Sequence, residues 1–169
     1  LNMLTSSKYI TEMERPTANA FDNDRNLGLM LFNQHFKKRL SWFAGYFYPS
    51  GNVGIYKGNQ YDLVFRLVGL PVYNVDDEYK VLHLGASFAH QYHDNSEVFY
   101  NIRPEAHLAP RYLNLKIPNV ADINEINGEF LLILNTFSLE SEYTVSYVKP
   151  SSSSTLSNSS YKFFAYYGT

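Results

Sequence analysis

The residues best placed to do chemistry form an alternating charged stretch near the middle of the chain. Arg103, Glu105, His107 and Arg111 are separated by apolar residues such as Ala106. Successive side chains of a β-strand point to opposite faces, so this stretch predicts a strand with its charged groups on one face. Such a face suits contact with water and small ions. The same charges can also pair with neighbouring strands and hold a wall rigid.

Two pairs of glutamates offer a different chemistry. Glu140 and Glu142, like Glu12 and Glu14, stand two residues apart, which on a strand places both carboxylates on one face. Their separation along a strand is about 7 Å, and a pair of carboxylates at a defined distance is what glycoside hydrolysis requires. Because nothing in the sequence marks a substrate cleft, we predict no catalytic residues and expect that the chain is not an enzyme.

Metal and nucleotide sites are also disfavoured. His83, His90 and His93 lack the tight spacing of a ligand motif. The glycines at 51, 54 and 58 are not followed by the Lys-Ser or Lys-Thr pair of a phosphate-binding loop. The chain has no cysteine, which removes thiolate ligands, disulfides and cysteine nucleophiles together. We therefore predict no metal and no cofactor.

Composition narrows the class of protein. The chain has 14 Lys plus Arg against 16 Asp plus Glu, so no strong overall field favours nucleic acid. Its 15 Tyr and 12 Phe suit strand surfaces and the aromatic belts of membrane interfaces. The longest apolar runs, such as 126–134, are too short for a helix to cross a bilayer. These observations favour an all-β protein with a single domain over 1–169.

Strands are predicted almost throughout, since apolar and polar residues alternate along most of the chain and no amphipathic helix is apparent. We count seven or eight. Residues 114–127, which include Pro118, are expected to be irregular. The predicted strands are 27–36, 40–48, 61–70, 81–92, 102–111, 128–136, 137–148 and 161–168.

The connections between these strands differ in length. Residues 37–39 form a short basic turn, whereas 49–60 read as an open loop rich in Gly and Asn. Residues 149–160 are rich in serine and predict a mobile loop, because they cannot bury enough apolar surface to fold compactly. Long loops at one end and short turns at the other are typical of outer-membrane barrels, so we expect the long loops to be extracellular.

Two architectures fit this alternation. A transmembrane antiparallel β-barrel would turn its apolar side chains outward to lipid and its polar ones inward. A soluble or surface β-barrel that binds a ligand without channel activity would alternate as well, but with the polar side outward. In the membrane architecture, Tyr46, Tyr48, Tyr61 and Tyr92 are expected near strand ends, where interface belts lie.

The amino-acid sequences of several segments resemble those of one known family. In order and spacing they resemble the phosphate-selective porin O and P family. The matching segments are 9–15, 82–88, 103–112, which begins Arg103-Pro104-Glu105, and 137–143. The resemblance covers 9–147. It departs at 113–116, where the family tends to carry a turn of aspartate, threonine and glycine, and at 16–19.

The resemblance implies a bacterial outer-membrane porin through which small anions such as phosphate diffuse passively. Such porins are closed barrels of about sixteen antiparallel strands, usually assembled as homotrimers. We expect this chain to supply about half of such a barrel, without a signal peptide. The expected partners are the lipid bilayer and small inorganic or organic anions, with no nucleic acid.

The predicted pore-lining residues carry both signs of charge. A phosphate pathway needs clustered arginine or lysine at its constriction, yet glutamates share the polar faces here. A general porin for small anionic or polar solutes fits these residues as well as a strict phosphate channel does. The pore-lining candidates are Arg66, Arg103, Glu105, His107, Arg111, Glu140 and Glu142.

Overall fold

The computed structural model describes residues 26–48, 59–76, 78–102, 110–111, 113–151 and 160–169. Over these residues the chain forms strands, turns and no helix. Among them, accordingly, no helix could cross a membrane. The strands are β1 (Leu27–His35), β2 (Leu40–Tyr48), β3 (Tyr61–Asn74), β4 (Lys80–Ile102), β5 (Leu113–Leu134), β6 (Phe137–Pro150) and β7 (Tyr161–Gly168).

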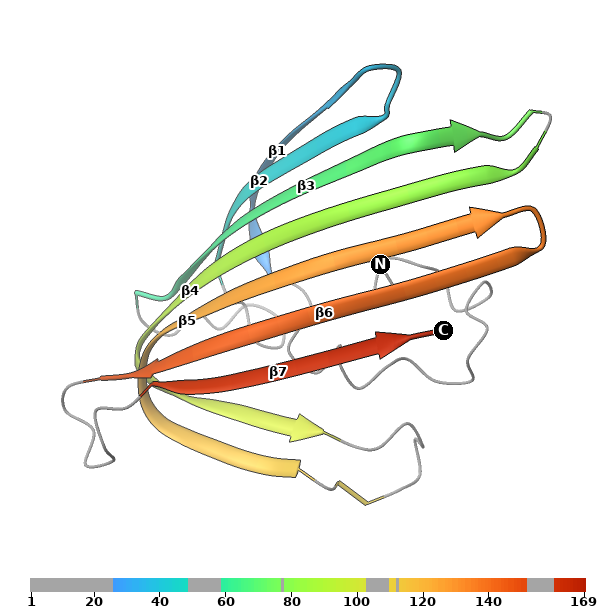
Figure 1. The fold of residues 1–169 in the computed structure, drawn as a ribbon. Coiled ribbons are helices and arrows are strands. Elements are labelled where there is room, and N and C mark those ends of the chain that lie inside the picture. The colour runs from blue at the N-terminus through green and yellow to red at the C-terminus, as the bar shows by residue number, and fades with distance from the viewer. Residues whose placement is uncertain (1–25, 49–58, 77, 103–109, 112, 152–159) are drawn as a thin grey trace.

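The strands form one antiparallel sheet in which each pairs with its neighbours in the sequence, in the order β1 to β7. The expected all-β, antiparallel fold class is therefore confirmed. The sheet is open, with β1 and β7 at its edges, and it twists strongly (Figure 1). Turns β1–β2, β3–β4 and β5–β6 lie at one end of the sheet (Figure 1).

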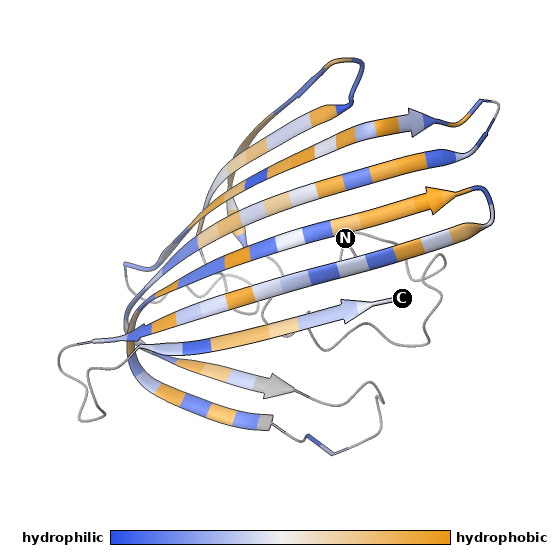
Figure 2. Ribbon diagram, in the orientation of Figure 1, coloured by the Kyte–Doolittle hydropathy of each residue, from blue (hydrophilic) through white to orange (hydrophobic). Residues whose placement is uncertain are grey.

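Most predicted strands agree with the structure. The hairpin of 27–36 and 40–48 corresponds to β1 and β2, whose register pairs His35 with Leu40. The strand predicted at 161–168 has the bounds of β7. In Figure 2 hydrophilic residues interrupt the hydrophobic ones along β3 to β6.

The prediction that 114–127 is irregular was wrong, since these residues belong to β5. Pro118 has no N–H to donate to the ladder, and Asn119 has a positive φ of 53°. The register moves from the pair Ser96–Val120 to the pair Val98–Ile117, so Pro118 and Asn119 form a bulge. The bulge interrupts the alternation on which the prediction relied, although the residues on both sides of it pair with β4.

The predicted charged strand is only partly testable. Residues 103–109 lie outside the described residues, while Pro110 and Arg111 are exposed and belong to no strand. They stand between the end of β4 and the start of β5.

The far ends of β4 and β5 fold back over one face of the sheet. We call residues 96–102 and 113–120 the inner hairpin, and the face beneath it the inward face. The register breaks between Tyr92 and Ser96, where Asp94 has a positive φ of 45°, and the hairpin turns back there (Figure 1). A bulge strengthens local twist and bends a strand, which explains the turn.

The main buried cluster joins the inner hairpin to the inward face. Tyr100, Ile117 and Val120 of the hairpin pack with Ile123 and Val148 of the sheet. The aromatic rings of Tyr100 and Phe163 lie 5.1 Å apart, and Tyr161 and Ala165 border the cluster. Burial of this apolar surface holds the hairpin against β6 and β7.

The opposite, outward face is apolar over its middle. Residues that pair across strands share a face, so the register defines rows that cross the sheet. One row across β2 to β7 contains no polar side chain, and its phenylalanines are exposed. This middle row is Ala44, Phe65, Phe88, Ile126, Val145 and Phe164.

Aromatic and polar residues replace the aliphatic ones at the end of the outward face near the long connections. Tyr61 stacks on Tyr46 at 5.8 Å and on Tyr92 at 5.3 Å, and Tyr46 contacts Tyr48 edge-on. We call two cross-strand rows the belt. The belt consists of Tyr46, Leu63, His90, Asn124, Tyr147 and Lys162 in one row, and Tyr61, Tyr92, Asp122 and Lys149 in the next.

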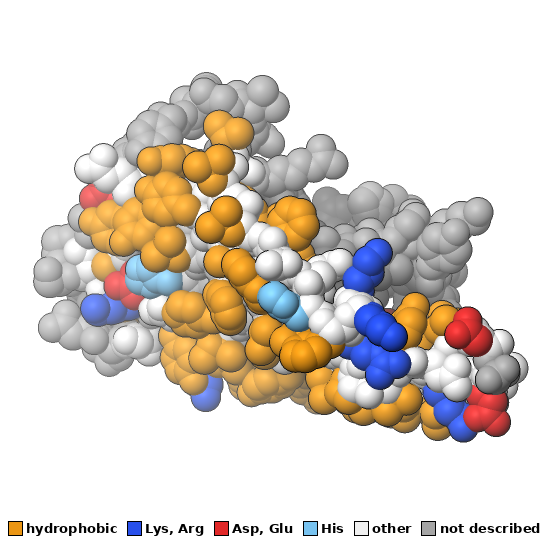
Figure 3. Space-filling view, turned by 90° about the horizontal axis from the view of Figure 1, so that it is seen from above, with side chains coloured by type: hydrophobic (Ala, Val, Ile, Leu, Met, Phe, Trp, Pro, Cys, Tyr) orange, Lys and Arg blue, Asp and Glu red, His pale blue; other side chains and the backbone are white. Residues whose placement is uncertain are grey.

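The expected position of four tyrosines near strand ends is confirmed for three of them. Tyr46, Tyr48 and Tyr61 lie at the ends of their strands, but Tyr92 lies within β4, where the strand bends toward the inner hairpin. In Figure 3 hydrophobic side chains cover the middle of the viewed surface, and most charged ones lie toward its ends.

Candidate pore-lining face

The inward face is polar where the outward face is apolar. Register places Arg66 beside Ser87, then Asn127 and Thr144, in one continuous row across β3 to β6. The next row contains Gly85, Glu129, Glu142 and Tyr167. Polar side chains in adjacent rows lie within reach of one another, and several of them form hydrogen bonds or ion pairs on the inward face.

The strongest interaction on this face is an ion pair between β3 and β5. The guanidinium Nη2 of Arg66 donates a hydrogen bond of 2.6 Å to Glu129 Oε2. His83 Nε2 lies 3.1 Å from the same oxygen. The side chain of Glu129 is only 5% exposed and that of Arg66 19%, so the pair is largely screened from solvent. The positive charge of Arg66 is therefore balanced by a carboxylate within the wall.

A glycine in β4 makes room for this pair. Gly85 is the cross-strand neighbour of Glu129 and lies between β3 and β5. A Cβ atom at Gly85 would come within 2.6 Å of Glu129 Oε2 and 3.1 Å of Glu129 Cβ. The absent side chain thus lets Glu129 lie across β4 and reach Arg66.

Two further glutamates lie on the same face. Glu142 faces Glu129 across β5 and β6 and is buried. Glu140 Oε1 accepts a hydrogen bond of 2.5 Å from the hydroxyl of Tyr167. Glu140 and Glu142 thus lie on one side of β6, as their spacing predicts.

Hydrogen bonds between side chains continue toward the inner hairpin. Asn127 Nδ2 donates to Thr144 Oγ1 at 2.8 Å. Ser146 Oγ donates to Glu125 Oε1 at 3.2 Å, and Gln91 Nε2 donates to Glu125 Oε2 at 3.3 Å. These bonds satisfy polar groups that are partly or wholly buried, and they extend the polar part of the inward face up to the apolar cluster beneath the inner hairpin.

The predicted pore-lining residues separate into three groups. Arg66, Glu140 and Glu142 share the inward face. Arg111 is exposed and stands just before the start of β5. Arg103, Glu105 and His107 lie outside the described residues.

Sequence reasoning missed the partner of Arg66. Glu129 stands 63 positions further along the chain, and it follows a stretch that was expected to be irregular. His83 was assigned no role beyond that of a disfavoured metal ligand. Alternation along β4 places His83 on the polar face. The sequence pattern therefore predicts the face on which His83 lies but not its partner.

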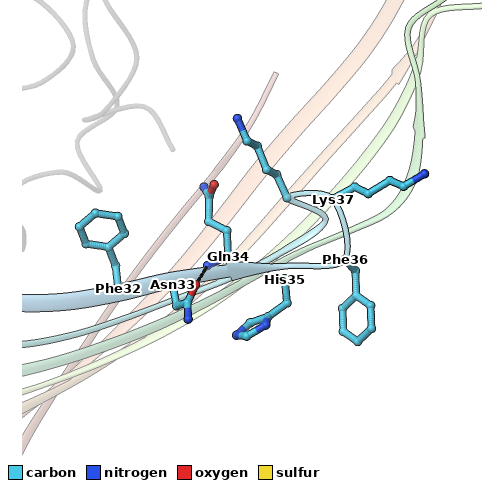
Figure 4. Close-up of a pocket in the computed structure, with 7 residues that line it drawn as sticks. Phe32, Asn33, Gln34, His35, Phe36 and Lys37 are labelled. Carbon is cyan, nitrogen blue, oxygen red and sulfur yellow. Dashed lines mark hydrogen bonds between the residues drawn. The ribbon is translucent and has the colours of Figure 1, made fainter.

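A shallow hollow lies at the β1–β2 turn, lined by residues 32–38. Figure 4 shows Phe36 pointing to the opposite side of the turn from Lys37. Phe36, Lys37 and Lys38 all have positive φ values, between 51° and 68°. Every residue of β1 is exposed because β1 is the sheet edge, so this hollow has only one wall and does not qualify as a binding site.

No group of three or more His, Asp or Glu side chains in the described part of the chain is arranged to hold a metal ion.

Comparison with known proteins gives one match. A family model described as phosphate-selective porin O and P matches residues 1–169. No curated protein and no solved structure matches the chain.

Proposed function

The chain belongs to the phosphate-selective porin O and P family, and on that premise we propose that it forms wall of an outer-membrane channel for passive diffusion of small anions such as phosphate. The proposal places the outward face in lipid and the inward face along a water-filled pathway. The bacterial outer membrane is the corresponding location.

The observation that carries this proposal is the opposite chemistry of the two faces. The middle row is apolar across six strands, with Phe65 and Phe164 exposed at 48% and 61%. A soluble barrel would turn polar side chains to that side, so the arrangement favours a lipid-facing wall over a soluble ligand-binding barrel.

The height of the apolar band agrees with a bilayer. Asn124 in the belt and Leu134 at the opposite end of β5 are both outward. The strand between them spans about 33 Å, or about 23 Å of height at a tilt near 45°. The apolar band of outer-membrane barrels is about 25 Å tall with an aromatic girdle at its edge, which is the position of the belt.

We infer that the pathway runs along the inward face and past the inner hairpin. Side chains of the hairpin reach across to Phe163 in β7, so the hairpin occupies space on the pore side and narrows it. The pore-lining set that we propose is Arg66, Arg103, Glu105, His107, Arg111, Glu140 and Glu142.

Charge distribution suggests which residues set anion preference. Arg66 is paired with Glu129 at 2.6 Å, so its field is largely cancelled within the wall. Arg111 is exposed and has greater access to a passing ion. We therefore expect anion preference to depend on Arg103 and Arg111 more than on Arg66.

The complete channel needs more strands than the seven described here. The edges of this sheet, β1 and β7, each carry backbone groups that must be paired before the sheet can lie in hydrocarbon. We propose closure into a barrel of about sixteen strands, the size that leaves an aqueous channel, and assembly as a homotrimer.

Conductance in planar bilayers tests the proposal. The complete protein is reconstituted and reversal potentials are measured under gradients of potassium chloride and potassium phosphate. We expect potentials of the sign given by anion permeation, and a smaller anion preference for Arg111→Gln. A preference for potassium in the unmodified protein would contradict the anion channel, and absence of conductance would contradict the channel itself.

A further inference from the structure

The belt carries positive charge on a face that is otherwise apolar. Lys149 and Lys162 both point outward, because they pair in register with outward residues of β5 and β6. A charged side chain at the lipid side of a barrel is costly unless it reaches an interface or an opposite charge. Each of these lysines is therefore expected at an interface, where an anionic neighbour would stabilise it further.

The described residues supply little of that neutralisation. Lys162 Nζ lies 5.4 Å from the ring centre of Tyr147, and no carboxylate among the described residues pairs with it. Lys149 Nζ lies 3.7 Å from Asp122 Oδ2, with its side chain 65% exposed. A separation of 3.7 Å is long for a charge-assisted hydrogen bond, so both ammonium groups stay open to a further partner.

The surroundings of the two lysines suit the headgroup of a lipid. The stacked Tyr61 and Tyr92 lie on β3 and β4 in the row of Lys149. His90, which bonds Asn124 at 2.9 Å, lies with Tyr147 in the row of Lys162. Aromatic rings with one apolar and one wet end are typical of the level at which headgroups lie.

We propose that the belt around Lys149 and Lys162 binds the phosphate groups of a phosphorylated glycolipid in the outer leaflet. The proposal rests on the proposed function for its membrane orientation, because long connections at the belt end place it at the outer leaflet. At that leaflet the phosphate-bearing lipid is a glycolipid of the lipid A type, whereas phospholipids fill the inner leaflet.

Lipid binding to the complete protein in detergent tests this inference. The probes are diphosphorylated lipid A, the same lipid after removal of its phosphates, and phosphatidylglycerol, and bound lipid is counted by native mass spectrometry. We expect Lys162→Gln and Lys149→Gln each to weaken binding of diphosphorylated lipid A about fivefold, the usual contribution of one juxtamembrane cation.

The structure offers a matched control. Lys116 also lies 5.4 Å from an aromatic ring, that of Phe99. It belongs to the inner hairpin and has a carboxylate partner in Glu97 at 2.8 Å. Lys116→Gln should leave binding of the lipid within twofold of the unmodified protein. Circular dichroism of each variant checks that the sheet is intact.

Several results would overturn the inference. Equal binding of the lipid without phosphates, equal binding of phosphatidylglycerol, or equal weakening by Lys116→Gln would each do so. A Lys162→Cys variant that forms disulfide-linked pairs, where the unmodified protein forms none, would show that a second copy covers the belt instead. Conductance is measured separately, and a protein that binds the lipid through Lys162 without conducting would contradict the channel but keep this surface.

Discussion

The outward and inward faces are built from the same strands but satisfy their side chains in different ways. In β4, the outward Leu84 and Phe88 are exposed at 44% and 43%, while the inward His83, next to Leu84 in the chain, bonds Glu129. The apolar side chains of the outward face thus require an apolar environment, whereas the polar side chains of the inward face pair with one another. Alternate side chains of one strand are therefore suited to two different environments.

The largest expected effect comes from placing a charge on the wrong face. Leu84→Arg puts a guanidinium near the middle of the apolar band, where a cation costs about 2–4 kcal/mol. Unfolding by urea in lipid vesicles should show a loss of this size.

Ser87→Arg is the matched control, three positions away on the inward face. We expect a loss below that of Leu84→Arg, because water reaches this side and offsets most of the repulsion from Arg66, the cross-strand neighbour of Ser87. Equal losses for the two variants would mean that the faces do not differ in solvent.

The next effect concerns the apolar contact on the otherwise polar inward face. Ile117 is 4% exposed in the cluster that holds the inner hairpin. Ile117→Ala should cost about 2 kcal/mol of stability and loosen the hairpin. Single-channel conductance should rise, because the pore side becomes wider. An unchanged conductance at reduced stability would show that the hairpin does not limit flow.

A smaller effect is expected from breaking the ion pair. Glu129→Gln leaves Arg66 and His83 without their shared carboxylate, at a cost of about 1–2 kcal/mol. Anion preference in planar bilayers should increase, because the charge of Arg66 is no longer cancelled.

Glu78→Gln is the control for this substitution. Glu78 is fully exposed in the β3–β4 turn, and the hydrogen bond with Lys80 lowers its pKa below the usual value. Neither stability nor ion preference should change measurably. A similar shift of preference in both variants would mean that overall charge, not the inward pair, is responsible.

The smallest effect concerns the space that holds the pair in place. Gly85→Ala introduces a Cβ that must displace the Glu129 carboxylate from its position 2.6 Å away. We expect a loss of about 1 kcal/mol and a shift of ion preference in the same direction as Glu129→Gln. Added to Glu129→Gln, the alanine should have little further effect on preference, and additive shifts would separate Gly85 from the pair.

Much of the sheet could be predicted from the sequence, because alternation directly encodes which face a residue occupies. It worked best in β3, where Leu63, Phe65 and Leu67 are exposed and the residues between them are partly or fully buried. It failed at Pro118, where a bulge breaks the period without ending the strand.

The inward network could be predicted only in part. The shared face of Glu140 and Glu142 followed from their spacing, since it is a property of one strand. The pairing of Arg66 with Glu129 depends on the register of three strands and on the missing side chain of Gly85. Such a contact cannot be read from a single segment of the sequence.

The order of the strands, each pairing only with its neighbours in the chain, also has a consequence for kinetics. No strand waits for a distant part of the chain, so the sheet can grow by adding one strand at a time, with only the connection to the preceding strand to close at each step. Until the last strand is placed, however, the growing edge exposes unpaired backbone groups that can capture another chain. Slow insertion would therefore lead to aggregation, and the yield of refolding should depend on the concentration of the protein.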